Sequence, residues 1–137
     1  MPIIEGTRAL QKEAKGEYDF AVDGGAASTI TLRASSDDIM GNEIPAGSVI
    51  FGGYIEVDTI LASGGAPTVA VNSEGAADLL AATAFNAAPW STTGRKSIIP
   101  VSTGASSVKT TVKRSLAITI AVAALTGGKF RVVVFYR

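Results

Sequence analysis

The 137-residue chain contains neither cysteine nor histidine, and its 12 acidic and 12 basic residues give a net charge of zero. Disulfide bonds, Cys/His zinc sites and Ser-His-Asp or Cys-His catalysis are therefore excluded. Apolar residues make up 47% of the chain and charged residues only 18%, below the usual value of roughly a quarter. So few charges favour burial of part of the surface against other subunits.

The charges are distributed unevenly along the chain. Residues 1–94 hold all 12 acidic residues and 4 basic ones, a balance of −8, whereas 95–137 hold 8 basic residues and no acidic one. Either the two parts interleave in one sandwich and neutralise each other, or a basic face meets the acidic face of a neighbouring copy, head to tail. A nucleic-acid stripe is disfavoured because the basic residues are dispersed, with only Phe130 and Tyr136 among them as stacking candidates.

Residues 1–16 are interpreted as an N-terminal arm. Gly6 and Gly16 bracket a segment in which Leu10 and Ala14 allow a short helical turn, and nothing in it resembles core. Such termini become ordered mainly when a partner holds them. The segment also lacks the apolar region of a signal peptide. The predicted organisation is an arm, 1–16, followed by a β domain, 17–137.

The first part of the β domain shows a hydrophobic period of two. Residues 17–23 (EYDFAVD) predict a half-buried strand that ends at the glycine pair 24–25. Residues 28–33 follow closely enough to complete a hairpin. Residues 35–47 contain several turn signals and predict a loop.

The longest strand signal covers Ser48–Leu61 (SVIFGGYIEVDTIL). Its odd-numbered residues, including Phe51, are predicted on one face, and its even-numbered residues, including Ile50 and Tyr54, on the other. Because strands usually have about three to ten residues, the pair Gly52-Gly53 predicts a bulge or a bend that turns a corner between two sheets. A glycine turn and a short strand over 67–73 follow.

The middle of the chain is ambiguous. The alanine content of Ala76–Phe85 permits a helix, but a β-rich environment favours a strand or extended segment, which we predict. Trp90 in the following loop is interpreted as a core residue rather than a ligand platform. Ile98–Val101 predicts an edge strand, since Pro100 cannot donate a hydrogen bond to a neighbouring strand.

In the C-terminal part of the chain, large apolar residues alternate regularly with small or polar ones. Strand signals continue through 108–113, and residues 116–122 (LAITIAV) predict a strand that buries Leu, Ile, Ile and Val on one face. Residues 126–128 predict a hairpin turn. The last strand, 129–137, is apolar on both faces, so it is central in a sheet or covered by another chain. The longest apolar run, 116–125, has about ten residues, half the length of a membrane span.

These signals amount to about eight strands separated by glycine-rich turns. They predict an all-β fold: a β-sandwich of antiparallel strands, of the jelly-roll type.

Few residues are suited to catalysis or ligand binding. Glu56 and Asp58 could be imagined as a glycosidase pair, but a solvated strand face is favoured. Asp37-Asp38, in a loop with Glu43, could bind a hard cation together with loop carbonyls, although no EF-hand spacing is present. The loop 91–96 could hold an anion, but a polar surface loop is favoured, and no glycine pair matches a phosphate-binding motif. No enzyme activity, metal or cofactor is expected.

Four segments resemble small virion proteins of tailed bacteriophages, some of which are capsid decoration (cement) proteins. They are YDFAVDGGAA at 18–27, IPAGS at 44–48, APWSTTGRK at 88–96 and LTGGKF at 125–130. The resemblance covers most of 17–137. It implies a β-sandwich or jelly roll, present in the virion as a homotrimer on the outside of the capsid shell. The implied partners are the major capsid protein and further copies of the chain, with the arm reaching across neighbouring subunits.

The candidate contact residues with the shell and with other copies lie in the arm and in one loop. They are Ile3, Ile4, Arg8, Leu10 and Lys12, together with Arg95 and Lys96. The alternative is a tail, fibre or receptor- or carbohydrate-binding virion module. A sugar site should show exposed aromatic residues on one face, and the chain has one Trp and three Tyr for that purpose. Neither nucleic acid nor membrane is expected as a partner.

Overall fold

The computed structural model describes residues 12–34, 42–73, 75, 77–98 and 108–137. Their strands are β1 (Lys12–Asp19), β2 (Thr29–Thr31), β3 (Arg33–Ala34), β4 (Glu43–Ile44), β5 (Val49–Ala62), β6 (Thr68–Asn72), β7 (Leu80–Ala84), β8 (Gly94–Ile98), β9 (Val108–Lys109), β10 (Arg114–Ser115), β11 (Ala117–Ala121) and β12 (Gly127–Tyr136). One helical turn, α2 (Phe20–Asp23), follows β1.

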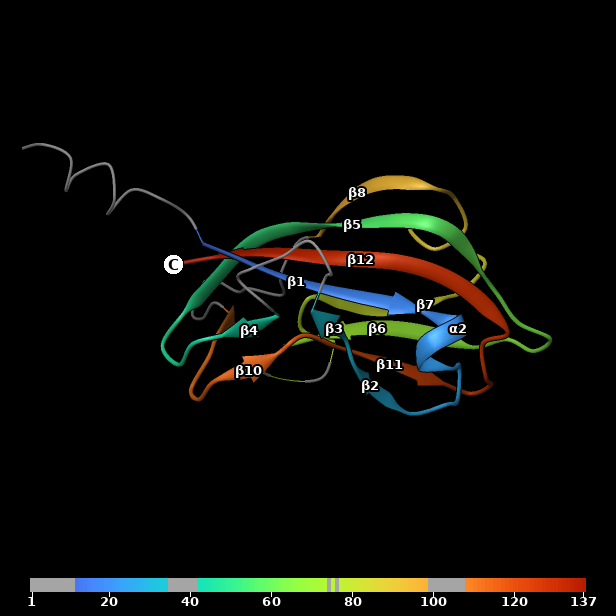
Figure 1. Ribbon diagram of the computed structural model, residues 1–137, viewed down its shortest axis with the longest axis horizontal. Helices are drawn as coiled ribbons and strands as arrows, with labels where there is room; N and C mark the ends of the chain where they lie inside the picture. The colour runs from blue at the N-terminus through green and yellow to red at the C-terminus, as the bar shows by residue number, and fades with distance from the viewer. Residues whose placement is uncertain (1–11, 35–41, 74, 76, 99–107) are drawn as a thin grey trace, which may run out of the picture.

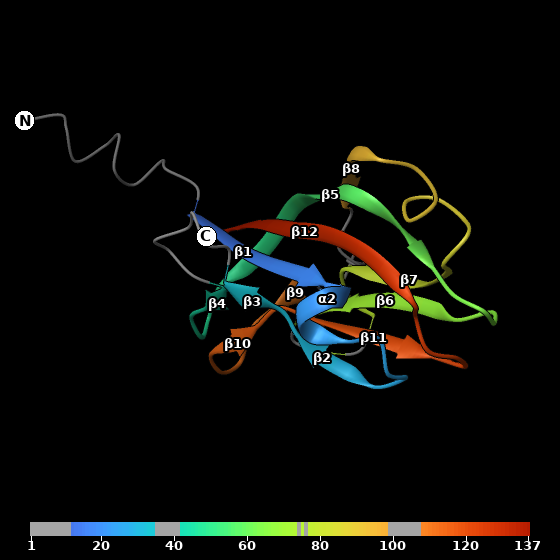
Figure 2. The same cartoon turned by 45° about the vertical axis from the view of Figure 1, so that its right-hand side comes forward.

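The strands form two facing antiparallel layers, as Figures 1 and 2 show. The larger sheet has the order β3-β1-β12-β5-β8, with β9 also paired to β5. The smaller sheet has the order β2-β11-β6-β7, and β4 and β10 form a separate ribbon. The predicted all-β sandwich is confirmed.

The core lies between the sheets and takes the inward-facing side chains of both. Phe130, Val132, Val134 and Tyr136 of β12 belong to it, as the period of two predicted. β12 lies between β1 and β5, which confirms that the last strand is central. Trp90 is fully buried, with its ring centroid 4.8 Å from that of Phe130. The prediction that Trp90 is a core residue is therefore confirmed.

The first strand begins within the segment 1–16 that the sequence predicts as an arm. β1 begins at Lys12 and pairs continuously with β12, and Ala14 is fully buried. Gly16 also packs closely against Leu32, since a Cβ on Gly16 would lie 2.6 Å from Leu32 Cβ. Residues 12–16 thus belong to the sheet because β12 supplies a partner along their whole length. The rest of the predicted arm, 1–11, lies outside the described residues.

The predicted strand over 17–23 is wrong beyond Asp19. The Asp19 carboxylate accepts a hydrogen bond from the Ala21 N–H at 3.0 Å, and the Asp23 carboxylate accepts one from the Asp19 N–H at 2.9 Å. These reciprocal bonds stabilise the single turn α2 in place of further strand. The predicted hairpin is also divided, because β3 pairs with β1 whereas β2 pairs with β11 in the other sheet.

β5 contains the predicted irregularity but turns no corner. Its 14 residues stay in the larger sheet, paired with β12 on one side and β8 on the other. Phe135 is in register with Gly52, whereas the next residue, Tyr136, is in register with Ile50. Phe51 is therefore the extra residue of a β-bulge.

The bulge changes which side chains share a face. Ile50 is buried in the core together with Ile55, although sequence alternation placed them on opposite faces. Phe51 is 44% exposed and lies on the outer face, on the same side as Tyr54. A one-residue insertion shifts the parity of every residue on one side of it.

The remaining strands confirm some predictions and correct others. β7 shows that the ambiguous segment is extended rather than helical over Leu80–Ala84. β8 starts at Gly94, within the loop predicted over 91–96, and is an edge strand, whereas the edge strand predicted over Ile98–Val101 lies outside the described residues beyond Ile98. Val122 is 80% exposed, not buried, because its φ of +78° takes the chain out of the β region and ends β11. The predicted turn at 126–128 is not a hairpin turn, since it connects strands of different sheets.

Candidate functional site

A row of alternating charges crosses the outer face of the larger sheet. Reading across five strands, the residues in register are Arg33 on β3, Glu17 on β1, Arg131 on β12, Glu56 on β5 and Arg95 on β8. Opposite charges directly across a strand pair stabilise it. The acidic N-terminal part and the basic C-terminal part of the sequence thus interleave in one sheet, as the first of the two interpretations of their charge predicted.

Glu56 is the centre of this charge row. Its Oε2 lies 3.2 Å from Arg131 Nη2 and 3.5 Å from Arg95 Nη2. Arg131 Nη2 also lies 3.9 Å from Asp58 Oδ1. Because Arg131 bridges the two carboxylates, Glu56 and Asp58 are an ion-pair network rather than an acid–base pair.

Of the other acidic candidates, only Glu43 lies in the part of the chain that the structure describes. Asp37-Asp38 lie outside the described residues, and the Glu43 carboxylate lies 3.4 Å from Lys113 Nζ. No group of three or more His, Cys, Asp or Glu residues that could hold a metal ion occurs in the described part of the chain. Likewise, no helix among these residues is long and apolar enough to cross a membrane.

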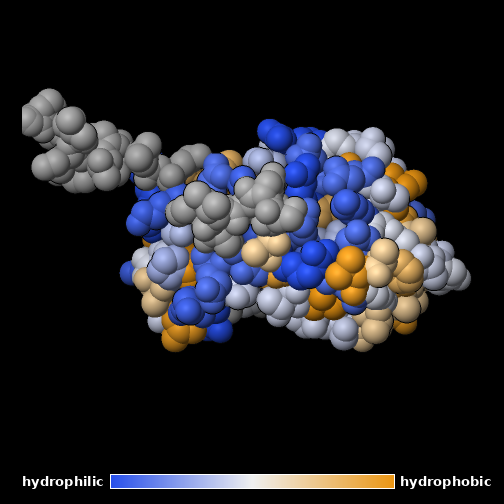
Figure 3. All heavy atoms as spheres, in the orientation of Figure 1, coloured by the Kyte–Doolittle hydropathy of each residue, from blue (hydrophilic) through white to orange (hydrophobic). Residues whose placement is uncertain are grey.

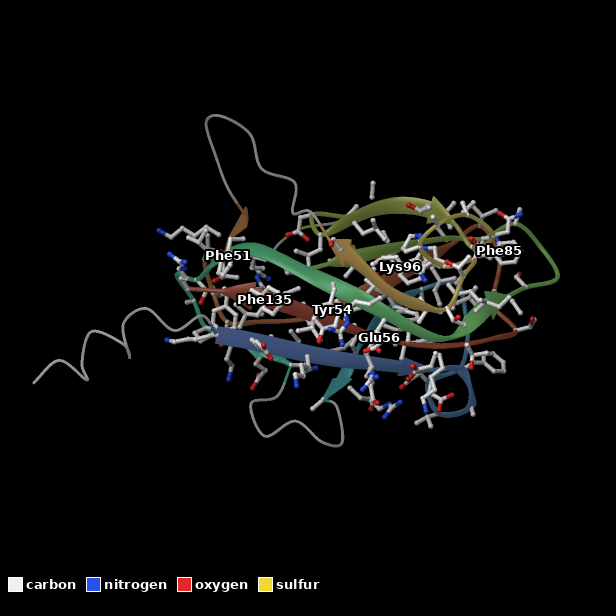
Figure 4. All side chains as sticks on the ribbon, turned by 90° about the horizontal axis from the view of Figure 1, so that it is seen from above. Phe51, Tyr54, Glu56, Phe85, Lys96 and Phe135 are labelled. Carbon is white, nitrogen blue, oxygen red and sulfur yellow. The ribbon has the colours of Figure 1, made fainter. Side chains whose placement is uncertain are left out.

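An aromatic patch adjoins the charge row on the same face. It consists of Phe51 and Tyr54 on β5 and Phe135 on β12, which Figure 4 labels, together with Val133 on β12. The Phe135 ring centroid lies 6.3 Å from that of Phe51 and 6.1 Å from that of Tyr54. Val133 is only 4% exposed although it lies outside the core cluster. This face is therefore a small second apolar cluster, open to solvent at Phe51.

Two arginines lie over the aromatic patch. The Arg95 guanidinium is 4.1 Å from the centroid of the Tyr54 ring, and that of Arg137 is 5.0 Å from the centroid of Phe51. Such cation–π contacts attract a guanidinium to the face of an aromatic ring. Aromatic residues and arginine are enriched at protein interfaces relative to the rest of the surface.

The corner of the face beyond Phe51 carries cations without acidic partners. Arg137 exchanges two backbone hydrogen bonds with Val49, and Lys109 is in register with Val49 on its other side. Neither Lys109 nor Arg137 forms an ion pair with an acidic residue that the structure describes. We call Phe51, Lys109 and Arg137 the basic corner.

The contact residues predicted from sequence are placed only in part. Ile3, Ile4, Arg8 and Leu10 lie outside the described residues. Lys12 is exposed at the start of β1, opposite Tyr136, and Arg95 belongs to both the charge row and the aromatic patch.

Lys96 has a different role from its neighbour Arg95. Its Nζ donates hydrogen bonds to the carbonyls of Thr92, of Thr93 at 2.8 Å and of Gly94 at 3.4 Å. An ammonium group has three N–H donors, so the loop's own backbone occupies all of them. Lys96 therefore holds the loop in shape, which argues against the anion site considered for 91–96.

Sequence reasoning missed the aromatic patch because simple alternation separates Phe51 from Tyr54. The apolar second face of β12, with Val133 and Phe135, was the signal that could have identified it. The chain is therefore an antiparallel β-sandwich. The outer face of its larger sheet carries a row of ion-paired charges and, beside it, a partly exposed aromatic patch.

Chains of three solved phage capsids share this fold. For the cyanophage Pam1 capsid the TM-score is 0.59 at 21% identity, covering 92% of this chain and 83% of that one. For the Ralstonia phage GP4 capsid the TM-score is 0.60 at 20% identity, covering 93% of this chain and 84% of that one. For the acidic stable capsid of Helicobacter pylori bacteriophage KHP30 the TM-score is 0.60 at 14% identity, covering 93% of this chain and 87% of that one. No family model matches the chain, and no curated protein matches it.

Proposed function

We propose that this chain is a bacteriophage capsid decoration (cement) protein, located in the virion, that binds the outside of the head shell and stabilises it. The observation that carries the proposal is the shared fold over 92–93% of the chain with chains of three phage capsids. The virion-protein segments in the sequence support the same role independently of the fold.

The surface fits a structural role. A protein that strengthens a shell needs a rigid scaffold and complementary faces, and it needs no catalytic group. The described residues offer a sandwich with a continuous core and one face on which aromatic rings and arginines lie together. Homodimer and homotrimer contacts commonly use such apolar faces.

The sandwich is proposed to be a jelly roll. Its eight principal strands run in the orders β1-β12-β5-β8 and β2-β11-β6-β7, and consecutive strands repeatedly change sheet. This alternation between two four-strand orders is the pattern expected of two Greek keys in one sandwich.

Residues 1–11 are proposed to form the arm that contacts neighbouring subunits and the major capsid protein. Ile3, Ile4, Arg8 and Leu10 supply apolar and basic contacts there, with Lys12 at the root of the arm and Arg95 on the domain. The proposed arm ends before Lys12 rather than at Gly16, because residues 12–16 belong to β1.

The proposal is tested on the particle of the phage that encodes the chain. Cryo-electron microscopy of purified virions should show the sandwich on the outer surface of the head. Heads that lack the protein should release their genome at a lower temperature, and adding the purified chain should restore the original release temperature. Absence of the chain from virions, or its location on the tail or a fibre, contradicts the decoration role, and the second result supports the alternative virion module.

A further inference from the structure

Cations on the outer face of the larger sheet are paired with carboxylates in the charge row but not at the basic corner. In the row, Arg131 and Arg95 lie 3.2 and 3.5 Å from the same Glu56 carboxylate. At the corner, Lys109 and Arg137 are both exposed, and neither is ion-paired with an acidic residue of the described ranges. Positive charge is therefore left uncompensated at this corner.

Lys12 adds an exposed cation at the same end of the sheet. It is in register with Tyr136, the residue that precedes Arg137, and it also has no ion pair with a described acidic residue. The neighbouring Glu13 carboxylate lies 3.9 Å from Lys15 Nζ instead. Even an α-carboxylate at Arg137 would leave this end of the sheet with an excess of positive charge.

The two cations of the corner project from paired backbone. Arg137 and Val49 exchange backbone hydrogen bonds of 2.9 and 3.1 Å, and Lys109 is in register with Val49 on its other side. Directly after Lys109, the Thr110 N–H donates to the Ser48 carbonyl at 2.9 Å. A partner that binds both cations therefore does not have to order the strands that carry them, which lowers the cost of binding.

An aromatic ring lies between these cations and the rest of the face. The β-bulge turns Phe51 outward, where its side chain is 44% exposed and its ring centroid lies 5.0 Å from the Arg137 guanidinium. Figure 4 shows Phe51 at the outer end of the aromatic patch, with Phe135 and Tyr54 between it and Glu56. The corner thus offers apolar surface and positive charge side by side.

The opposite end of the sandwich differs in charge. Residues 60–67 and 121–128, which connect strands at that end, include no charged residue. Figure 3 shows this right-hand end as mainly pale to orange surface. Because the uncompensated cations gather at one end only of the long axis, an acidic partner is drawn to that end.

We propose that the basic corner binds an acidic segment of another protein, in which carboxylates flank an apolar side chain. The carboxylates pair with Lys109 and Arg137, and the apolar side chain covers Phe51. Charge complementarity carries this assignment, since these cations lack the carboxylates that the other arginines of the face have. The inference rests on the proposed function, in which a protein of the shell supplies the segment.

A nucleic-acid strand fits this surface less well. Proteins that bind single strands provide a basic groove along which several successive phosphates lie. Here the cations end at the aromatic patch, which Glu13, in register with Phe135, and Glu56, beside Tyr54 in Figure 4, border with carboxylates. Phosphates that continue across the face are therefore repelled.

A titration of the full chain with three probes tests the ligand class. The first probe is an acetylated and amidated peptide in which aspartates alternate with leucines, the second has asparagine in place of each aspartate, and the third is an oligothymidine of similar length. In nuclear magnetic resonance spectra, the aspartate peptide should shift the amide signals of Val49, Phe51, Lys109 and Arg137. Its binding should weaken with salt and be about tenfold or more tighter than that of the asparagine peptide.

Substitutions locate the contact. Lys109→Gln and Arg137→Gln should each raise the dissociation constant of the aspartate peptide about threefold, and the double variant about tenfold. Phe51→Ala should weaken binding without changing its salt dependence. Lys113→Gln is the matched control, because it removes a lysine with a 68% exposed side chain that is paired with Glu43 outside the corner. It should leave binding unchanged, and circular dichroism should be the same for all variants.

Binding to heads that lack the protein separates this inference from the proposed function. If the wild type and the double variant coat such heads equally well, the corner is not the contact and the inference fails, while the decoration role stands. If the wild type binds no heads but binds the aspartate peptide through the corner, the decoration role fails and the ligand class stands. Equal binding of the two peptides, variants that lose nothing, or tighter binding of the oligothymidine each overturn the inference.

Discussion

Glu56 on β5 and Arg131 on β12 are 75 residues apart in sequence, yet Arg131 Nη2 lies 3.2 Å from Glu56 Oε2. The pair is the centre of a row in which charges alternate across five strands. A one-residue slip of β12 against β5 would place Val132 or Phe130 on the outer face and bury a guanidinium. The charge row therefore helps to specify the register of the strands that present the aromatic patch.

The Glu56–Arg131 pair should stabilise the fold modestly. In a double-mutant cycle of Glu56→Gln and Arg131→Gln, we expect a coupling free energy below about 1 kcal/mol, because both side chains are about one-third exposed, at 29% and 34%. Urea unfolding at low and high salt measures it, and the coupling should fall with salt. The more exposed pair Glu43–Lys113 is the control and should show almost none. A coupling that salt leaves unchanged would mean that packing, not charge, joins the two residues.

The two glycines of β5 should respond differently to alanine. A Cβ on Gly53 would lie 2.3 Å from the Val133 carbonyl oxygen, whereas a Cβ on Gly52 would meet only Phe135 Cδ2, at 3.9 Å. Gly53→Ala should therefore destabilise the fold by about 1–3 kcal/mol, since backbone has to move. Gly52→Ala should stay within about 1 kcal/mol of the wild type. Thermal unfolding of the two variants decides this, and equal losses would contradict the close approach of β5 to β12.

Trp90 should tolerate phenylalanine better than alanine. Its ring packs on Phe130 in the core, but its Nε1–H is buried without a hydrogen-bond partner in the described structure. Trp90→Ala leaves a cavity and should cost about 3–5 kcal/mol. Trp90→Phe keeps most of the ring contact and removes the unpaired donor, so its cost should be clearly smaller. Chemical denaturation gives both values. Equal costs would show that the indole donor has a partner.

Tyr18 should make the fold sensitive to alkali. Burial, then the nearby Asp23 and Asp19 carboxylates, raises the pKa of Tyr18 from 10.0 to about 12. Because the folded pKa lies above the unfolded one, the stabilisation is fully present below about pH 10 and is lost as pH rises towards 12. The phenolate absorbance of the native protein should thus show Tyr18 titrating late, with Tyr136, whose pKa burial also raises, shifted in the same direction.

Tyr18→Phe provides the control. It removes the 2.6 Å hydrogen bond from the Tyr18 hydroxyl to the Gly24 carbonyl and should cost about 1 kcal/mol at neutral pH. The loss of stability between pH 10 and 12 should then shrink. An unchanged alkaline profile would assign the effect to Tyr136, whose pKa burial also raises.

Two truncations separate the proposed arm from the domain. Removing residues 1–11 should leave the unfolding temperature nearly unchanged, since β1 begins at Lys12. Removing residues 1–16 deletes most of β1, up to Gly16, including the fully buried Ala14, and should cost several kcal/mol or prevent folding. Circular dichroism and thermal melts compare the two. Equal stability of both chains would return the domain boundary to Gly16.

Strand identity and the core could be read from the sequence because alternation is a local property. The inward side chains of β12, the buried Trp90 and the extended segment that became β7 all follow from period, turn residues and β-propensity. Val122 is the instructive failure. Its position in the pattern marks it as core, but a single residue with φ of +78° turns it outward, and no periodicity reports a dihedral angle.

By itself the sequence determined the class of fold, the absence of cysteine and histidine chemistry, and the opposed charges of its two parts. Only the tertiary structure decided which strands those charges join and which side chains share a surface. Strand pairing brings Glu56 to Arg131, and the bulge at Phe51 brings that ring beside Phe135. Both depend on register between segments far apart in the chain, and register is set by the packing of the whole sheet rather than by any local pattern.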